Sequence, residues 1–164
     1  MFRTLALGLV SALFFPAMLA CEKTPAPVVP EASHEERNEQ EDVLMPETIK
    51  ITVSGKSLPV KIVANEATKA LVAALREASI TYEADDYGGF EKVGPLGRSL
   101  PTGNAQITTQ PGDVILYSGN QIVLFYGSNS WSYTRIGKIE YGTLDELKSF
   151  LKAGEGKIKV TLSL

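Results

Sequence analysis

The chain has 164 residues, a formal net charge of −3, one cysteine and one histidine. This length leaves room for about one domain. The histidine, His34, and the cysteine, Cys21, both lie before residue 48. Residues 48–164 therefore cannot contain a disulfide, a cysteine nucleophile, a Ser-His-Asp triad or a zinc-thiolate site. We predict no metal and no other cofactor.

Residues 1–20 have the three parts of an export signal. A positive charge at Arg3 precedes an apolar stretch from Leu5 to Leu13, and small residues stand before Cys21. A transmembrane helix needs about 20 apolar residues and does not usually run directly into a polar, proline-rich stretch. We therefore predict a signal peptide, with an uncleaved anchor helix as the alternative.

The four residues Met18-Leu19-Ala20-Cys21 resemble the lipobox of bacterial lipoproteins, whose cysteine becomes the lipidated N-terminus after cleavage. Each buried methylene contributes about 0.8 kcal/mol, so several acyl chains anchor a protein stably. The resemblance implies an exported lipoprotein, held in the bacterial cell envelope through Cys21 at the periplasmic face or the cell surface. Glu22 follows the cysteine in place of the aspartate that favours inner-membrane retention, which weakly favours the outer membrane.

The residues after Cys21 have the composition of a spacer. Residues 22–47 carry eight acidic residues against Lys23 and Arg37, a net charge of −6, with several prolines and no aromatic residue. Such a segment repels itself and cannot bury a core, so we predict a disordered linker over residues 21–47. A short helix at 33–44 is the alternative.

Residues 48–164 form the predicted domain. Their net charge is +2, without a basic patch, so we expect no nucleic acid partner. The 117 residues are enough to bury a single core.

Alternating apolar residues predict that this domain consists mostly of strands. In chain order we expect strands at 49–53, 58–63, 80–84, 107–109, 114–117, 121–126, 133–140 and 157–164. Helices are expected at 66–78, capped by Asn65, and at 143–152, opened by the capping box of Thr143 and Glu146. The glycine-rich segment 85–105 is expected as a long loop, with at most one short hairpin, that acts as a flap. We predict a mainly β fold, a closed barrel of about eight strands with two helices in the order β-β-α-β(several)-α-β.

The element order and residues 110–139 resemble cyclophilins. Over nearly all of 48–164 the chain is similar to a group of small bacterial cyclophilin-like domains. Their signature is like PGD-x-x-x-Y…LFYG…SYT-x-IG-x-I, present here at 111–113, Tyr117, 124–127 and 132–137. The resemblance implies a cyclophilin-like barrel, but that group has no settled biochemical role.

Cyclophilins isomerise Xaa-Pro bonds with an arginine over the proline amide, a glutamine, an apolar pocket and a rim of His and Trp. The resemblance carries the glutamine to Gln121, the pocket phenylalanine to Val123, the tryptophan to Trp131 and the rim histidine to Tyr133.

The expected arginine is missing from its strand, which is Ile80 to Ala84 here. Without a cation the twisted amide loses electrostatic stabilisation, usually the largest catalytic contribution. Arg98 and Arg135 are the candidate substitutes. An exposed charge or an ion-pair partner is the alternative interpretation of Arg135.

The run from Gln121 to Tyr126 has two faces. Gln121, Val123 and Phe125 share one face, and the three residues between and after them share the other. One face must belong to the core whatever the protein does. Trp131 is interpreted either as a residue at the rim of a cleft or as an anchor that caps the barrel.

The leading hypothesis is a lipid-anchored, extracytoplasmic binding module for a peptide or small-molecule ligand. Gln121 would exchange hydrogen bonds with the ligand, and the groove would consist of Val123, Phe125, Trp131 and Tyr133. The alternative is a divergent peptidyl-prolyl cis-trans isomerase acting on cell-envelope proteins, with Gln121, Arg98 and Arg135 as catalytic residues. A third hypothesis is a structural domain without a ligand cleft.

Overall fold

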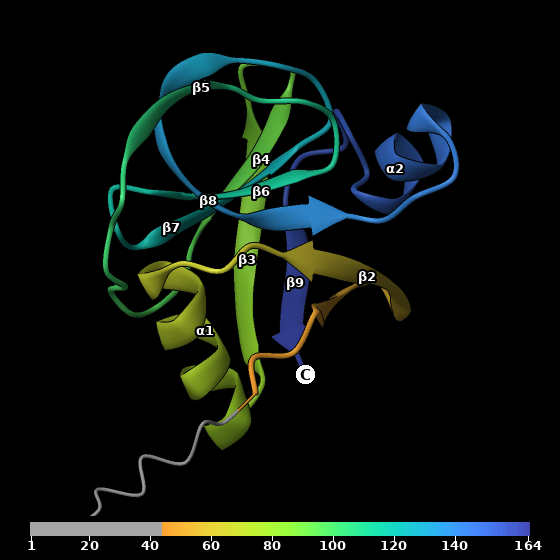
Figure 1. The fold of residues 1–164 in the computed structure, drawn as a ribbon. Coiled ribbons are helices and arrows are strands. Elements are labelled where there is room, and N and C mark those ends of the chain that lie inside the picture. Colours follow the sequence, from red (N-terminus) through yellow and green to blue (C-terminus); the bar gives the residue numbers. More distant parts are fainter. Residues whose placement is uncertain (1–43) are drawn as a thin grey trace, which may run out of the picture. The chain divides into compact units, whose positions relative to one another are not determined.

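The computed structural model describes residues 44–164, which Figure 1 shows as a ribbon. The predicted signal peptide, the predicted lipidation site Cys21 and nearly all of the predicted linker lie outside the described residues. Neither helix within 44–164 has the length and apolar character needed to cross a bilayer.

Nine strands and two helices make up the described part of the chain. They are β1 (Thr48–Val53), β2 (Lys56–Ile62), α1 (Glu66–Glu77), β3 (Ile80–Tyr87), β4 (Glu91–Pro95), β5 (Ala105–Thr108), β6 (Asp113–Tyr117), β7 (Gln121–Phe125), β8 (Ser130–Ile139), α2 (Leu144–Phe150) and β9 (Ile158–Ser163). This order confirms the predicted β-β-α-β(several)-α-β sequence of elements.

Eight of the strands close into an antiparallel barrel. The ring runs β2-β1-β9-β3-β4-β7-β6-β8 and returns to β2, where Val60 pairs with Ile139. Strand β5 lies outside the ring and pairs with the first residues of β8, Ser130 to Tyr133. A ring leaves no free edge among its members, and the closed barrel confirms the predicted fold class.

The two helices contribute to the barrel core and lie on different sides of the barrel, α1 at the lower left and α2 at the upper right of Figure 1. The buried face of α1 includes Leu71 and Leu75, and Leu147 of α2 is fully buried. Each helix begins at a side-chain cap, as predicted: the Asn65 Oδ1 accepts from the Thr68 N–H at 2.9 Å, and the Thr143 box is complete.

Strand β7 is buried on both faces. Ile122 and Leu124 point into the barrel core. Val123 and Phe125 point outward into a second cluster, with Ile115, Tyr133 and the partly buried Phe90, Val93 and Ile107. We call this second group the outer cluster. The predicted division of the run into two faces is confirmed, and both faces prove to be packed.

The segment expected as a long loop with at most one short hairpin begins with such a hairpin. Strand β3 continues to Tyr87, and β4 follows after Gly88 and Gly89. Both glycines have positive φ, +62° and +76°, which is the backbone that a tight turn needs and that only glycine adopts easily. Gly94 is also required, because a Cβ there would collide with the Glu83 carbonyl and the Tyr82 ring.

The rest of that segment is hydrogen-bonded to the turn between β6 and β7, whereas the sequence predicted a flap. The Leu96 N–H donates to the Asn120 carbonyl and the Leu100 N–H to the Gly119 carbonyl, both at 2.8 Å. Both leucine side chains are buried in the barrel core.

An ion pair within the β3–β4 hairpin is hydrogen-bonded to the segment before β9. The Lys92 side chain is fully buried, and its Nζ lies 2.8 Å from the Asp86 Oδ2 and donates to the Gly156 carbonyl. Burial opposes the charge on Asp86, but Lys92, backbone N–H groups and the Tyr126 hydroxyl outweigh it and hold its pKa below the ordinary value. The positive charge of Lys92 is thus compensated within the fold by the carboxylate of Asp86.

Candidate ligand-binding site

A pocket of about 370 Å³ lies over the outer cluster, on the outside of the barrel. Strands β3, β4, β6, β7 and β8 all contribute to it, together with one residue before β8. Its lining residues are Tyr87, Glu91, Val93, Tyr117, Gln121, Val123, Asn129, Trp131 and Tyr133. The volume and the mainly apolar, aromatic lining are those of small-ligand sites.

The structure brings together four residues that the sequence singled out. Gln121 and Val123 enter the pocket from β7, and Trp131 and Tyr133 enter it from β8. They converge because β6 pairs with both strands and places them side by side. Trp131 is 57 % exposed, which fits the rim interpretation better than that of an anchor.

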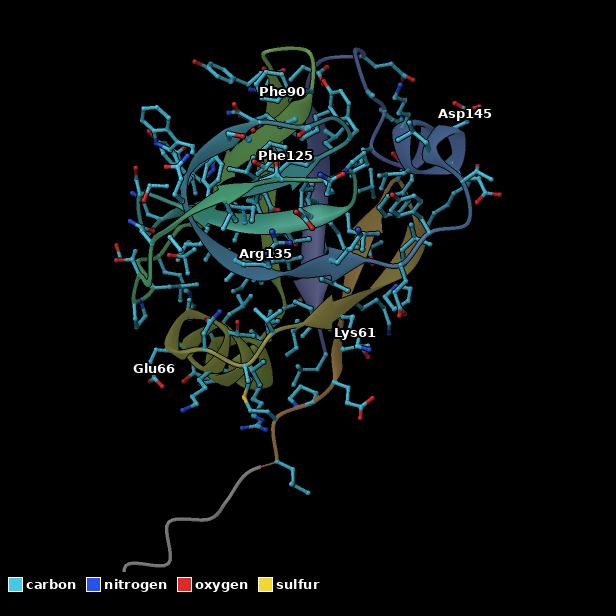
Figure 2. The ribbon with its side chains drawn as sticks, turned by 45° about the horizontal axis from the view of Figure 1, so that its top comes forward. Lys61, Glu66, Phe90, Phe125, Arg135 and Asp145 are labelled. Carbon is cyan, nitrogen blue, oxygen red and sulfur yellow. The ribbon has the colours of Figure 1, made fainter. Side chains whose placement is uncertain are left out.

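Phe125 was expected to line the groove, but it is not among the residues that line the pocket. It is fully buried in the outer cluster, where its ring stacks on Phe90 with centroids 6.3 Å apart and meets the Tyr133 ring edge-on at 5.8 Å. Figure 2 shows Phe90 and Phe125 near one another in the upper part of the domain. Phe125 packs behind the lining residues Val123 and Tyr133 in the outer cluster.

The two candidate arginines do not line the pocket. Arg98 is exposed in the segment after β4. The Arg135 Nη1 lies 2.8 Å from the Oδ1 of Asp113, a buried residue, in an ion pair that lacks hydrogen-bond geometry. Figure 2 shows Arg135 below Phe125. The structure thus does not assemble Gln121, Arg98 and Arg135 into one site, and Arg135 fits the ion-pair interpretation.

Sequence reasoning missed the residues that the β3–β4 hairpin supplies. Tyr87, Glu91 and Val93 line one side of the pocket, whereas the sequence predicted them in a long loop with at most one short hairpin and singled out none of them as a site residue. The Gly88-Gly89 pair between two strand-like runs was the signal that could have found them. Tyr117 was noted only as part of a signature, and Asn129 was not singled out.

Among the described residues that line the pocket, Glu91 is the only one with an acidic or basic side chain of the Asp, Glu, Lys or Arg type. Its side chain is 5 % exposed, and its Oε2 is buried without a hydrogen-bond partner. Burial disfavours the ionised carboxylate and raises the pKa of Glu91 to about 7. The pocket therefore contains an acid that changes its charge near neutral pH.

Tyr133 lies close to this acid. Burial and then the negative charge of Glu91 raise the pKa of the Tyr133 hydroxyl, and a hydrogen bond of 3.0 Å from the Asn129 Nδ2 partly opposes them. The Tyr117 ring meets the Tyr133 ring edge-on at 6.1 Å. Phenol hydroxyls, the side-chain amides of Gln121 and Asn129, and one carboxyl group thus define the polarity of the pocket.

Comparison with known proteins identifies the fold. The sequence model of the Cyclophilin-like family matches residues 51–163. The chain is also similar to the solution structure of the hypothetical protein AF2241 from Archaeoglobus fulgidus, at 18 % identity and a TM-score of 0.55, over 75 % of this chain and 98 % of that one. At this identity the likeness concerns the fold alone. No curated protein matches the chain.

We predict that Glu91→Gln stabilises the protein at alkaline pH. The folded state holds the Glu91 proton more tightly than the unfolded chain, so the stability it contributes is full below pH 4.5 and is lost as the pH rises through about 7. Glutamine cannot ionise and keeps that stability, at most about 3 kcal/mol. Thermal unfolding should show a higher Tm for the variant at about pH 8 and little difference at about pH 4.

The control is Glu77→Gln, which changes an exposed carboxylate on α1. Glu77→Gln should show no comparable increase in Tm at alkaline pH. An equal Tm difference between wild type and Glu91→Gln at both pH values would contradict the assignment.

Proposed function

The chain belongs to the cyclophilin-like family, and on that premise we propose that it is a binding module of the cell envelope. The module holds an extended peptide or a small ligand in the pocket on the outer face of the barrel.

Exposed aromatic side chains around the pocket carry this proposal. Tyr87, Tyr117 and Trp131 are 67 %, 38 % and 57 % exposed, and all three line it. Aromatic rings left in water around one hollow mark a surface where a ligand would bury them.

The walls of the pocket support binding because strands and a packed cluster hold them. Val123 and Tyr133 belong to both the lining and the outer cluster, and Phe125 packs directly behind them. A site that is formed before binding loses little conformational entropy when the ligand arrives.

The charge of the pocket favours binding over proline isomerisation. A divergent peptidyl-prolyl isomerase acting on cell-envelope proteins would need a cation or a strong donor at the proline nitrogen. Within residues 44–164 no arginine or lysine lines the pocket, and the charged residue there is the acid Glu91. Gln121 is the one predicted catalytic residue that lies in the pocket.

The cellular location rests on the sequence. The signal-like residues 1–20, the lipobox at Met18–Cys21 and the acidic, proline-containing residues 22–47 support a lipoprotein whose domain is held off the membrane by a spacer. Glu22 weakly favours the outer membrane.

Fluorescence of Trp131 tests ligand binding, since it is the only tryptophan in the chain. The probes are peptides of the form N-acetyl-Gly-Xaa-Gly-amide, in which Xaa runs over the common amino acids. We expect saturable quenching by one chemical class of Xaa, because a bound side chain changes the surroundings of the indole. Tyr87→Ala should weaken that binding several-fold, the usual contribution of an aromatic contact.

The matched control is Leu144→Ala, which removes an exposed apolar side chain at the start of α2, away from the pocket lining. It should leave the affinity unchanged. The proposal fails if no peptide alters the fluorescence, or if Leu144→Ala weakens binding as much as Tyr87→Ala.

Lipid attachment is tested with Cys21→Ser in the full chain. When the protein is made in a bacterium fed a clickable palmitate analogue, the wild type should incorporate the label and the variant should not. No other cysteine exists to accept a thioether-linked lipid. A wild-type protein without label, or one whose mature N-terminus does not begin at Cys21, would contradict the lipoprotein assignment.

A further inference from the structure

We propose that the pocket recognises a cationic N–H donor, the guanidinium or ammonium end of an arginine or lysine side chain in a peptide, through the carboxylate of Glu91. This inference rests on the proposed function, because it names the chemistry of the ligand that the pocket takes.

The unpartnered carboxylate is the first observation. Glu91 is 5 % exposed, lines the pocket, and leaves its Oε2 without a hydrogen-bond donor. Buried carboxylates in folded proteins almost always have donors, because an unsatisfied one is costly to bury. A ligand that brings N–H groups and a positive charge supplies what Glu91 lacks.

Nothing that lines the pocket neutralises Glu91 from within. Lys92 follows it directly in the chain, but neighbouring strand residues point to opposite faces. The Lys92 ammonium is paired with Asp86 and is therefore not available to Glu91. The lining residues in 44–164 include no arginine or lysine, so nothing in the lining compensates the negative charge of Glu91 once it ionises.

The aromatic walls are the second observation. Tyr117 and Tyr133 stand edge-to-face with an interplanar angle of 70°, and Tyr87 and Trp131 are exposed on the same pocket. Cations are attracted to the faces of such rings, and a planar guanidinium stacks on them. A carboxylate among aromatic rings thus provides both components of a site for a cationic side chain.

Such binding must depend on the protonation of Glu91. The titratable groups near it on other elements are phenol hydroxyls: Tyr87 of β3, Tyr117 of β6, Tyr133 of β8, and Tyr126, which follows β7. Phenols carry no charge near neutral pH, so Glu91 is the group that titrates there. A cation binds the ionised form, so its affinity increases as the pH rises through about 7, with release of a proton.

The test compares isosteric peptides by Trp131 fluorescence, with the full chain. N-acetyl-Gly-Arg-Gly-amide is titrated against the same peptide with citrulline, which keeps the shape and most N–H donors but has no charge. The lysine peptide is titrated against its Nε-acetyl derivative. Above neutral pH we expect the charged member to bind at least about tenfold more tightly, as charge-assisted hydrogen bonds do, with the advantage shrinking toward about pH 5.

Two variants test whether the preference for the charged peptide depends on Glu91. Glu91→Gln keeps the size of the side chain and should abolish the preference for the charged peptide, while the citrulline peptide binds within about threefold of its wild-type affinity. Glu77→Gln removes an exposed acid on α1 and should retain the full preference.

The outcomes separate the inference from the proposed function. Equal binding of both members in both pairs, or a preference that survives in Glu91→Gln, overturns the role of Glu91. If other peptides of the panel bind in that case, the binding module still stands. If no peptide binds at all, both proposals are overturned.

Discussion

The packing of β7 on two faces is the constraint on which this domain depends. Ile122 and Leu124 fill the barrel, while Val123 and Phe125 fill the outer cluster. Here the outer cluster makes the outside of β4, β7, β6 and β8 a second packed layer. The pocket is a hollow in that layer, so the lining residues Val123 and Tyr133 are held by the same contacts that stabilise the fold.

Two neighbouring residues on β4 show how the fold treats buried charge. Lys92 and Glu91 are both nearly inaccessible, yet Lys92 meets Asp86 and the Gly156 carbonyl, whereas Glu91 Oε2 meets no donor. The first arrangement ties three segments together and is structural. The second works against stability once the acid ionises, and groups that oppose stability are typical of functional sites. The contrast within one strand supports assigning Glu91 to ligand recognition.

The sequence predicted the features that arise from short-range patterns. Alternation and capping residues such as Asn65 located most strands and both helices, and the two-residue period placed Gln121 and Val123 on one face. The β3–β4 hairpin was allowed only as one short hairpin within a long loop, because the five glycines of residues 85–105 outweighed the strand signal, and Glu91 was therefore not singled out. The pairing of Arg135 with Asp113 and the burial of Phe125 depend on contacts between distant strands, which no local pattern encodes.

The most direct test of this account is the titration of Glu91 itself, followed by NMR through the chemical shift of its side-chain carboxyl carbon. In the free protein the carboxyl should titrate with a pKa of about 7. With saturating N-acetyl-Gly-Arg-Gly-amide the midpoint should move to lower pH, because the bound cation favours the ionised form. A free carboxyl that titrates near its ordinary value of 4.5, or a midpoint that the peptide does not move, would contradict the account.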